Sequence, residues 1–303
     1  MDKGASVIAK LKNKSKAYKK PFMLCLQLFC QEEFLRRISM SNYSQNLILK
    51  GGLFIYTLSN FESRSTIDVD FLLKNFPNNF PNNVDKIEKI ITEIIKIDSG
   101  NDFITFESSG YEKISPHRKY NGVSFKMIGK IKNTRTPFNV DIGVGDIIIP
   151  YAESRKIPTQ LENFTSPTIL TYSLESTISE KFDAIIQRLS LTSRMKDYFD
   201  IYYLSNTFDF NGEKLRTAIF ETLQNRGTEY RNETFDIIIS FSENESMKLK
   251  WNNFVKNLDF SHSSFNDVIE LLNNFLRPIW NSIISGTDFK KNWSCISKVW
   301  IND

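Results

Sequence analysis

The chain has few of the residues that enzymes use for metal binding and nucleophilic catalysis. Its 303 residues include two histidines and three cysteines, Cys25, Cys30 and Cys295, which lack the spacing of a metal-binding motif. We therefore do not expect a zinc hydrolase or a catalytic triad built on histidine. An odd number of cysteines is typical of a protein in a reducing compartment.

Long apolar runs are also lacking. The most apolar segment, residues 21–30, contains Gln27 and continues directly into charged residues, so it is too short for a membrane span. The basic stretch before it is too long for a signal peptide, and we expect a buried helix and a cytoplasmic protein. The net charge of +4 permits a polyanionic partner without arguing for one.

The order of apolar patterns predicts an α+β fold. We expect helices at residues 21–40, 53–61, 84–97, 172–189, 193–205 and 264–284, and strands at residues 46–52, 66–73, 102–108, 120–131 and 137–146. Residues 154–170 contain two prolines and are expected to form a linker or crossover. The predicted domains are residues 1–160, a mixed β-sheet flanked by helices, and residues 165–303, which are mostly helical.

The segment "KGGLFIYTLSNFESRSTIDVDFLLK" combines features of a phosphate site and a metal site. Asp68 and Asp70 alternate with apolar residues, so both carboxylates project from one face of a strand. Adjacent carboxylates repel unless a cation lies between them, and Mg²⁺ prefers such oxygen ligands. Gly51 and Gly52 precede a predicted helix, whose first N–H groups favour an anion. A lone D-x-D on a strand is more often a solvated face, but the adjoining Gly-Gly unit favours a functional site.

A third carboxylate lies on another predicted strand. Asp141 alternates with Val140 and Ile142 in "NVDIG", and three carboxylates on neighbouring strands suit a two-metal phosphoryl-transfer or nucleotidyl-transfer site. Asp141 is also a candidate base for the attacking hydroxyl. Asp146 is interpreted as a turn residue.

Charged residues recur at helical spacing in the second half. Lys181 and Arg188 lie two turns apart on one face, and Asp197 and Asp200 are three residues apart on the next helix. Such cations would balance a triphosphate and the departing pyrophosphate, and Asp197 would orient Lys181 or Arg188. By spacing alone, ordinary surface salt bridges between amphipathic helices explain the pattern better.

The order of these motifs resembles the AbiEii-type toxins, which are minimal nucleotidyltransferases of the DNA polymerase β superfamily. The resemblance covers residues 45–206 and depends on "KGG", "RSTIDVDF", "NVDIG", "SEKFDAIIQR" and "SRMKDYFDIYYL" in that order. It implies two roles for the matching residues. The catalytic and metal-binding positions are Asp68, Asp70, Asp141, Lys181 and Asp197, with the metal on the first three. The nucleotide-binding positions are Gly51, Gly52, Arg64, Lys181 and Arg188.

The resemblance also implies a function. We expect Mg²⁺-dependent transfer of a nucleoside monophosphate from an NTP to an RNA, with the tRNA 3′ end as the leading acceptor. Growth arrest or abortive infection would follow, and an antitoxin protein would be the partner. Two alternatives stay open: transfer to a small molecule such as an aminoglycoside, which predicts an acidic acceptor cleft, and a non-catalytic nucleotide-binding protein with the same fold.

Overall fold

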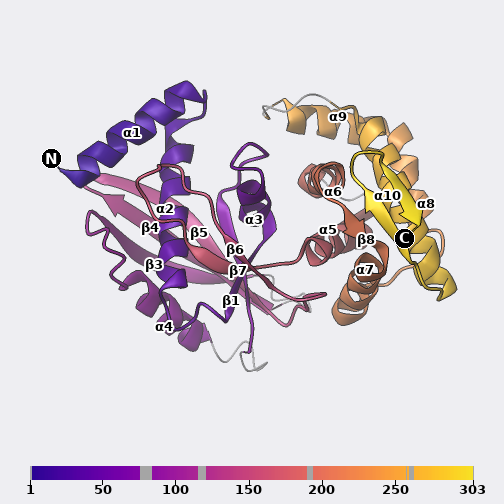
Figure 1. Cartoon of the computed structure of the whole chain (residues 1–303), viewed down its shortest axis with the longest axis horizontal. Coiled ribbons are helices and arrows are strands. Elements are labelled where there is room, and N and C mark those ends of the chain that lie inside the picture. The colour runs from indigo at the N-terminus through magenta and orange to yellow at the C-terminus, as the bar shows by residue number, and fades with distance from the viewer. Residues whose placement is uncertain are drawn as a thin grey trace. The chain divides into compact units, whose positions relative to one another are not determined.

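The structure is a computed structural model that describes residues 2–75, 84–114, 121–189, 194–256, 258 and 263–302. The two histidines lie outside these residues. The chain divides into two compact units (Figure 1). The first unit comprises Met1–Gly145 and Glu153–Thr171, and the second comprises Asp146–Ala152 and Tyr172–Asp303.

The first unit is built on a seven-stranded mixed sheet with the strand order β3-β4-β5-β2-β1-β7-β6. Its strands are β1 (Leu47–Lys50), β2 (Asp68–Leu73), β3 (Ile104–Ile114), β4 (Asn121–Ile131), β5 (Thr134–Val144), β6 (Glu153–Lys156) and β7 (Thr168–Thr171). The β2–β5 and β1–β7 pairs are parallel, and the others are antiparallel. The mixed sheet, and with it the predicted α+β class, is therefore confirmed.

The segment expected to be a linker instead forms the two strands β6 and β7 at one edge of the sheet. The prediction was wrong because the two prolines of this segment are not inside a strand. Pro158 follows the end of β6 and Pro167 immediately precedes β7. Proline interrupts pairing inside a strand but is tolerated at its ends and at a sheet edge.

Helix α2 (Phe22–Ser39) lies across the apolar face of the sheet (Figure 1). The ring of Phe34 packs edge-on against Phe71 of β2, Phe106 of β3 and Phe138 of β5. The other helices of this unit are α1 (Lys3–Ala17), α3 (Gly51–Leu58) and α4 (Val84–Ile95). Because α2 covers the apolar face, the alternate residues of β2 and β5 project from the opposite face.

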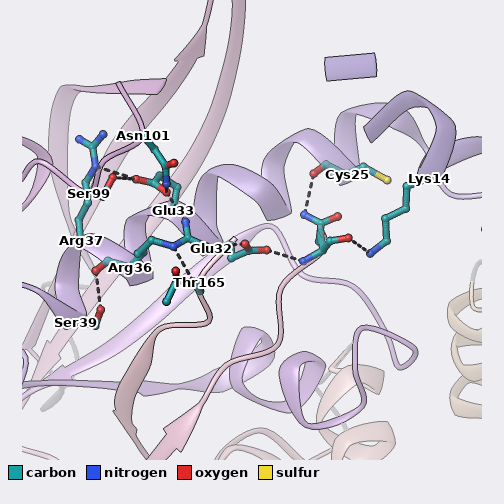
Figure 2. Close-up of polar contacts among 11 residues, drawn as sticks. Lys14, Cys25, Glu32, Glu33, Arg36, Arg37, Ser39, Ser99, Asn101 and Thr165 are labelled. Atoms are coloured by element: carbon teal, nitrogen blue, oxygen red, sulfur yellow. Dashed lines mark hydrogen bonds and ion pairs between the residues drawn. The ribbon is translucent and has the colours of Figure 1, made fainter. Parts of the chain in front are cut away.

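The last two turns of α2 carry four buried charges, Glu32, Glu33, Arg36 and Arg37 (Figure 2). Glu33 accepts hydrogen bonds from Arg36 and from Asn101 Nδ2, the latter at 2.8 Å. Glu32 accepts from Arg36 Nη2 at 2.9 Å, and burial raises the pKa of Glu32. Buried charges are tolerated when they are paired and hydrogen-bonded, as they are here.

These charges also bind the backbone of distant segments. Arg37 Nη2 donates to the carbonyl of Ile104, where β3 begins, at 2.8 Å. Arg36 Nε donates to the carbonyl of Thr165 at 2.9 Å, and the N–H of Gln160 donates to Glu32 at 2.8 Å. The helix is thereby joined to the β6–β7 connection on one side and to β3 on the other.

The second unit is mostly helical, as predicted. It contains α5 (Leu174–Arg188), α6 (Met195–Thr207), α7 (Gly212–Arg226), α8 (Thr234–Ser240), α9 (Glu245–Val255) and α10 (Phe265–Ser285), with a 3-10 turn at Phe241–Glu243. A small antiparallel sheet, β8 (Phe210–Asn211), β9 (Lys291–Ser294) and β10 (Val299–Asn302), was not predicted.

Helix α10 supplies much of the core of this unit. It starts with a capping box between Ser264 and Asp267 and ends at Gly286 in a left-handed conformation. Its buried Trp280 packs edge-on against Phe182 of α5, with the ring centroids 5.8 Å apart. Among the helices that the structure describes, none is long and apolar enough to cross a membrane.

We expect Glu33→Leu to lower the free energy of unfolding by about 3–5 kcal/mol, because Arg36 and Arg37 would keep buried charges without their shared carboxylate. Urea denaturation would measure the change. The exposed Glu88→Gln on α4 is the matched control and should change stability by less than about 0.5 kcal/mol. Equal stability of the two variants would show that the buried network does not hold α2 in place.

Candidate functional site

A row of polar side chains crosses four adjacent strands of the first unit. Asp70 of β2 is paired in register with Asp141 of β5 on one side and with Lys50 of β1 on the other. Ser124 of β4 is paired with Asp141, and its hydroxyl donates to Asp141 Oδ1 at 2.5 Å. Residues directly opposite each other in a sheet project from the same face. The two carboxylates are therefore neighbours, with Lys50 and Ser124 on either side.

Asp68 is held at the start of β2 by contacts from two directions. Its Oδ1 accepts a hydrogen bond from Asn139 Nδ2 of β5 at 3.1 Å. The carbonyl of Ile67, the residue before it, accepts from the side-chain amides of Gln27 and Gln31 on α2, both at 2.7 Å. The helix that covers the apolar face thus also positions the strand that carries the D-x-D.

The Gly-Gly pair begins helix α3 itself. Gly51 has a φ of +70°, and a Cβ at this position would lie 2.2 Å from Asp70 Oδ2. A Cβ on Gly52 would lie 2.9 Å from Thr66 Oγ1 and 3.5 Å from a terminal nitrogen of Arg64, whose side chain is buried. Only glycine fits both the backbone conformation and the close approach at position 51. The predicted Gly51, Gly52, Arg64 and Asp70 are therefore brought together.

The oxygen ligands of this face suit a hard divalent cation, although they do not form a complete metal cage. No three histidine, cysteine, aspartate or glutamate side chains in the described part of the chain are grouped as a metal site. Mg²⁺ needs no such cage, because it binds through one or two carboxylates and takes its remaining ligands from water and substrate phosphates. Neighbouring Asp70 and Asp141, with Asp68 two residues along β2, match that requirement.

A second group of predicted residues meets in the helical unit. Lys181 Nζ of α5 lies 3.1 Å from Asp197 Oδ1 and 2.8 Å from Asp200 Oδ2 of α6. Both carboxylates are fully buried, and Asp197 also pairs with Arg194. These are buried ion pairs, not the surface salt bridges that the helical spacing alone favoured. Arg188 lies at the last residue of α5, half-buried.

Asp146 also has a partner that the sequence did not indicate. Arg226, the last residue of α7, binds Asp146 at 2.9 Å, Glu180 at 2.8 Å and Asp183 at 3.0 Å. Burial by itself would lower the pKa of Arg226, but attraction to Glu180, Asp146 and Asp183 raises it. Arg226 therefore joins the segment Asp146–Ala152 to α5 and α7, which is more than the turn role expected for Asp146.

Sequence reasoning missed the residues that surround the carboxylates. Asn139 had a readable signal, since "NVD" places it two residues before Asp141 on the same strand face. Lys50 precedes the glycines, but its place opposite Asp70 depends on the β1–β2 register. Gln27 and Gln31 are separated from Ile67 by at least 36 residues and gave no local signal.

One family model matches most of the chain. The model of the family described as "Nucleotidyl transferase AbiEii toxin, Type IV TA system" matches residues 33–273. No curated protein sequence matches the chain. Among solved structures, MenT4, a nucleotidyltransferase toxin from Mycobacterium tuberculosis, has a TM-score of 0.55 at 13% identity, over 93% of this chain and 99% of its own. JHP933 from Helicobacter pylori has a TM-score of 0.46 at 11% identity, over 87% and 94%.

We expect Gly51→Ala to lower the free energy of unfolding more than Gly100→Ala does. The difference between the two variants measures the clash with Asp70, because the backbone strain is similar in both. Both glycines have a similar positive φ, but a Cβ at Gly100 has no atom within 4 Å. Strain alone costs about 1–2 kcal/mol at either position. Urea denaturation of both variants measures the difference. Equal losses would mean that Asp70 moves away without cost.

Lys181→Met should lower the free energy of unfolding by about 3–5 kcal/mol, because the buried carboxylates of Asp197 and Asp200 would lose their ion pairs with Lys181. The more exposed Lys248, paired with Glu245, is the control, and Lys248→Met should cost less than about 1 kcal/mol. Thermal or urea unfolding of both variants would show the contrast. A Lys181→Met protein as stable as wild type would contradict a structural role for the pair.

Proposed function

This chain belongs to the AbiEii family of nucleotidyltransferase toxins of type IV toxin–antitoxin systems, and we propose that it transfers a nucleoside monophosphate from an NTP to the 3′ end of an RNA, with tRNA as the leading acceptor. The acceptor oxygen would bond to the α-phosphorus as the bond to pyrophosphate breaks. The observation that carries the proposal is the register pair Asp70 and Asp141 beside Gly51.

The carboxylate face is the proposed catalytic centre. Asp68, Asp70 and Asp141 would hold Mg²⁺, with a two-metal site as the expected form. Bound Mg²⁺ supplies charge that neutralises the phosphates in the transition state. Asp141, whose Oδ1 accepts from Ser124, is the candidate to take the proton of the acceptor hydroxyl. Lys50, paired in register with Asp70, would reduce the repulsion between the carboxylates before nucleotide binds.

The start of α3 is the proposed triphosphate site. The first N–H groups of a helix have no partner within it and favour an anion. Gly51 and Gly52 let a phosphate approach the backbone closely, since neither has a side chain. Arg64, near the position of a Gly52 Cβ, would add a positive charge that phosphate binds strongly.

Lys181 and Arg188 of the helical unit are two further residues proposed to bind the nucleotide. Lys181 is held by Asp197 and Asp200. It is the proposed cation for a phosphate oxygen or the departing pyrophosphate, with Asp197 as a positioning residue. Arg188 is proposed as a further phosphate-binding cation.

An RNA acceptor is favoured over a small molecule by the positive charge of α1 and the residues that follow it. From Lys3 to Gln31 the sequence has seven lysines and no acidic residue. Contacts of lysine and arginine with phosphates supply much of the affinity for nucleic acids. With an RNA acceptor, we expect the reaction to take place in the cytoplasm and to cause growth arrest. We also expect an antitoxin protein as the partner.

Purified chain with Mg²⁺, total tRNA and each α-labelled NTP in turn should place label in tRNA with at least one nucleotide. Asp70→Asn should reduce the label at least about a hundredfold, as expected when one transition-state charge interaction is removed. Glu107→Gln, at an exposed position of β3, is the control and should keep activity.

Absence of label in tRNA with every NTP, from folded wild-type protein, would remove the RNA acceptor. Equal labelling by wild type and Asp70→Asn would remove the proposed catalytic centre.

A further inference from the structure

The first unit has a pocket at the end of α3 opposite to the glycines. Its volume is about 390 Å³. The residues that line it are Thr57, Leu58, Asn60, Arg155, Lys156, Ile157, Pro158 and Ser166. We call this the α3–β6 pocket. Gly51 and Leu58 are the two ends of α3, so the pocket lies about 10 Å along the helix from the proposed triphosphate site.

The charged residues that line the α3–β6 pocket are both cations, Arg155 and Lys156. Arg155 Nη2 pairs with Glu153 at 2.5 Å, and its guanidinium lies over the ring of Phe54, 5.8 Å from the centroid. Its Nε is buried and has no hydrogen-bond acceptor among the residues that the structure describes. Leaving a buried charged donor unsatisfied is costly, which favours a further acceptor at this guanidinium.

Two lysines, one from α1 and one from the turn after it, contact the segments on either side of this pocket. Lys20 Nζ donates to the Tyr56 hydroxyl at 3.0 Å and to the Phe61 carbonyl at 2.5 Å, on the α3 side. Lys14 Nζ donates to the Gln160 carbonyl at 2.7 Å, in the segment after Pro158. Lys16 and Lys19, between these two lysines, are exposed. The cationic surface therefore continues from the pocket onto α1.

We propose that the α3–β6 pocket binds a phosphate group of the nucleic-acid strand that enters the catalytic centre, with the side chains of Arg155 and Lys156 as the phosphate ligands. The hydroxyl of Ser166 and the amide of Asn60 add uncharged donors. That this strand is the acceptor rests on the proposed function. That the pocket binds phosphate rests on the residues that line it. Phosphate suits the site because guanidinium N–H groups bind its oxygens directionally.

A row of phosphates explains the surface better than one small anion does. A single phosphate would need only the pocket, but the lysines of α1 extend the positive charge well beyond it. Strand phosphates repeat along a backbone, so one in the pocket would place others near Lys16 and Lys19. The bound strand would then run from α1 past the end of α3.

The double variant Arg155→Gln/Lys156→Gln tests the proposal through binding alone. A fluorescently labelled single-stranded RNA would be titrated at several salt concentrations without NTP. We expect affinity to fall about tenfold at low salt, and the salt dependence to become less steep by about 0.7 for each phosphate that the variant no longer binds. The control is Lys86→Gln/Lys89→Gln on α4, which removes the same charge from exposed positions and should leave both quantities unchanged.

Parallel titrations with ATP and with inorganic phosphate distinguish the source of the phosphate. Lower affinity for these ligands with unchanged RNA affinity would overturn the assignment to a strand and indicate a free nucleotide. Unchanged affinity for all three ligands, in a variant that unfolds like wild type, would overturn the pocket as a phosphate site. Because no transfer is measured, weaker RNA binding by the variant would support the pocket even if tRNA proves not to be the acceptor.

Discussion

The parallel, in-register pairing of β2 with β5 is the constraint on which the site depends. It places Asp70 directly beside Asp141 and Asp68 beside Asn139. Two neighbouring carboxylates repel each other, so the arrangement is stable only where nearby groups compensate the charge. Lys50 and Ser124 flank the pair on the next strands. The same negative charge that these groups compensate is what would attract a divalent cation.

Helix α2 connects this constraint to the rest of the first unit. Its amides Gln27 and Gln31 hold the carbonyl before Asp68, and its buried charges bind β3 and the β6–β7 connection. Buried ion pairs add little to net stability compared with apolar packing of the same size. They do require specific partners at specific places, and here those partners lie on segments far from one another in sequence. These buried charges therefore fix geometry more than they add free energy.

The sequence predicted the features that are local and missed those that depend on distant pairing. The strand with alternating Asp68 and Asp70, the glycines before a helix and the helical second half follow from short-range patterns. The mixed sheet and its α+β class followed from the order of those patterns. Strands β6 and β7 have four residues each, and proline lies beside both, so their period-two signal was too short to detect. Strands β9 and β10 of the small C-terminal sheet also have four residues each.

Burial was the other property that sequence could not provide. Asp197 and Asp200 have the spacing of a solvated helix face, yet both are fully buried against Lys181. Whether a charged helix position faces water is decided by what packs over it, and here this is α5. The register partners of Asp70 likewise depend on which strands meet, and Asp141 comes from a strand far along the chain.

The two units are interleaved along the chain, because Asp146–Ala152 belongs to the second unit while Glu153–Thr171 returns to the first. Any single cut of the gene between Gly145 and Tyr172 therefore leaves one unit without part of itself. A fragment that ends at Gly145 lacks β6 and β7, and one that begins at Tyr172 lacks Asp146, the partner of Arg226. The two units must consequently be inherited as one piece, and recombination cannot exchange either one as a simple module.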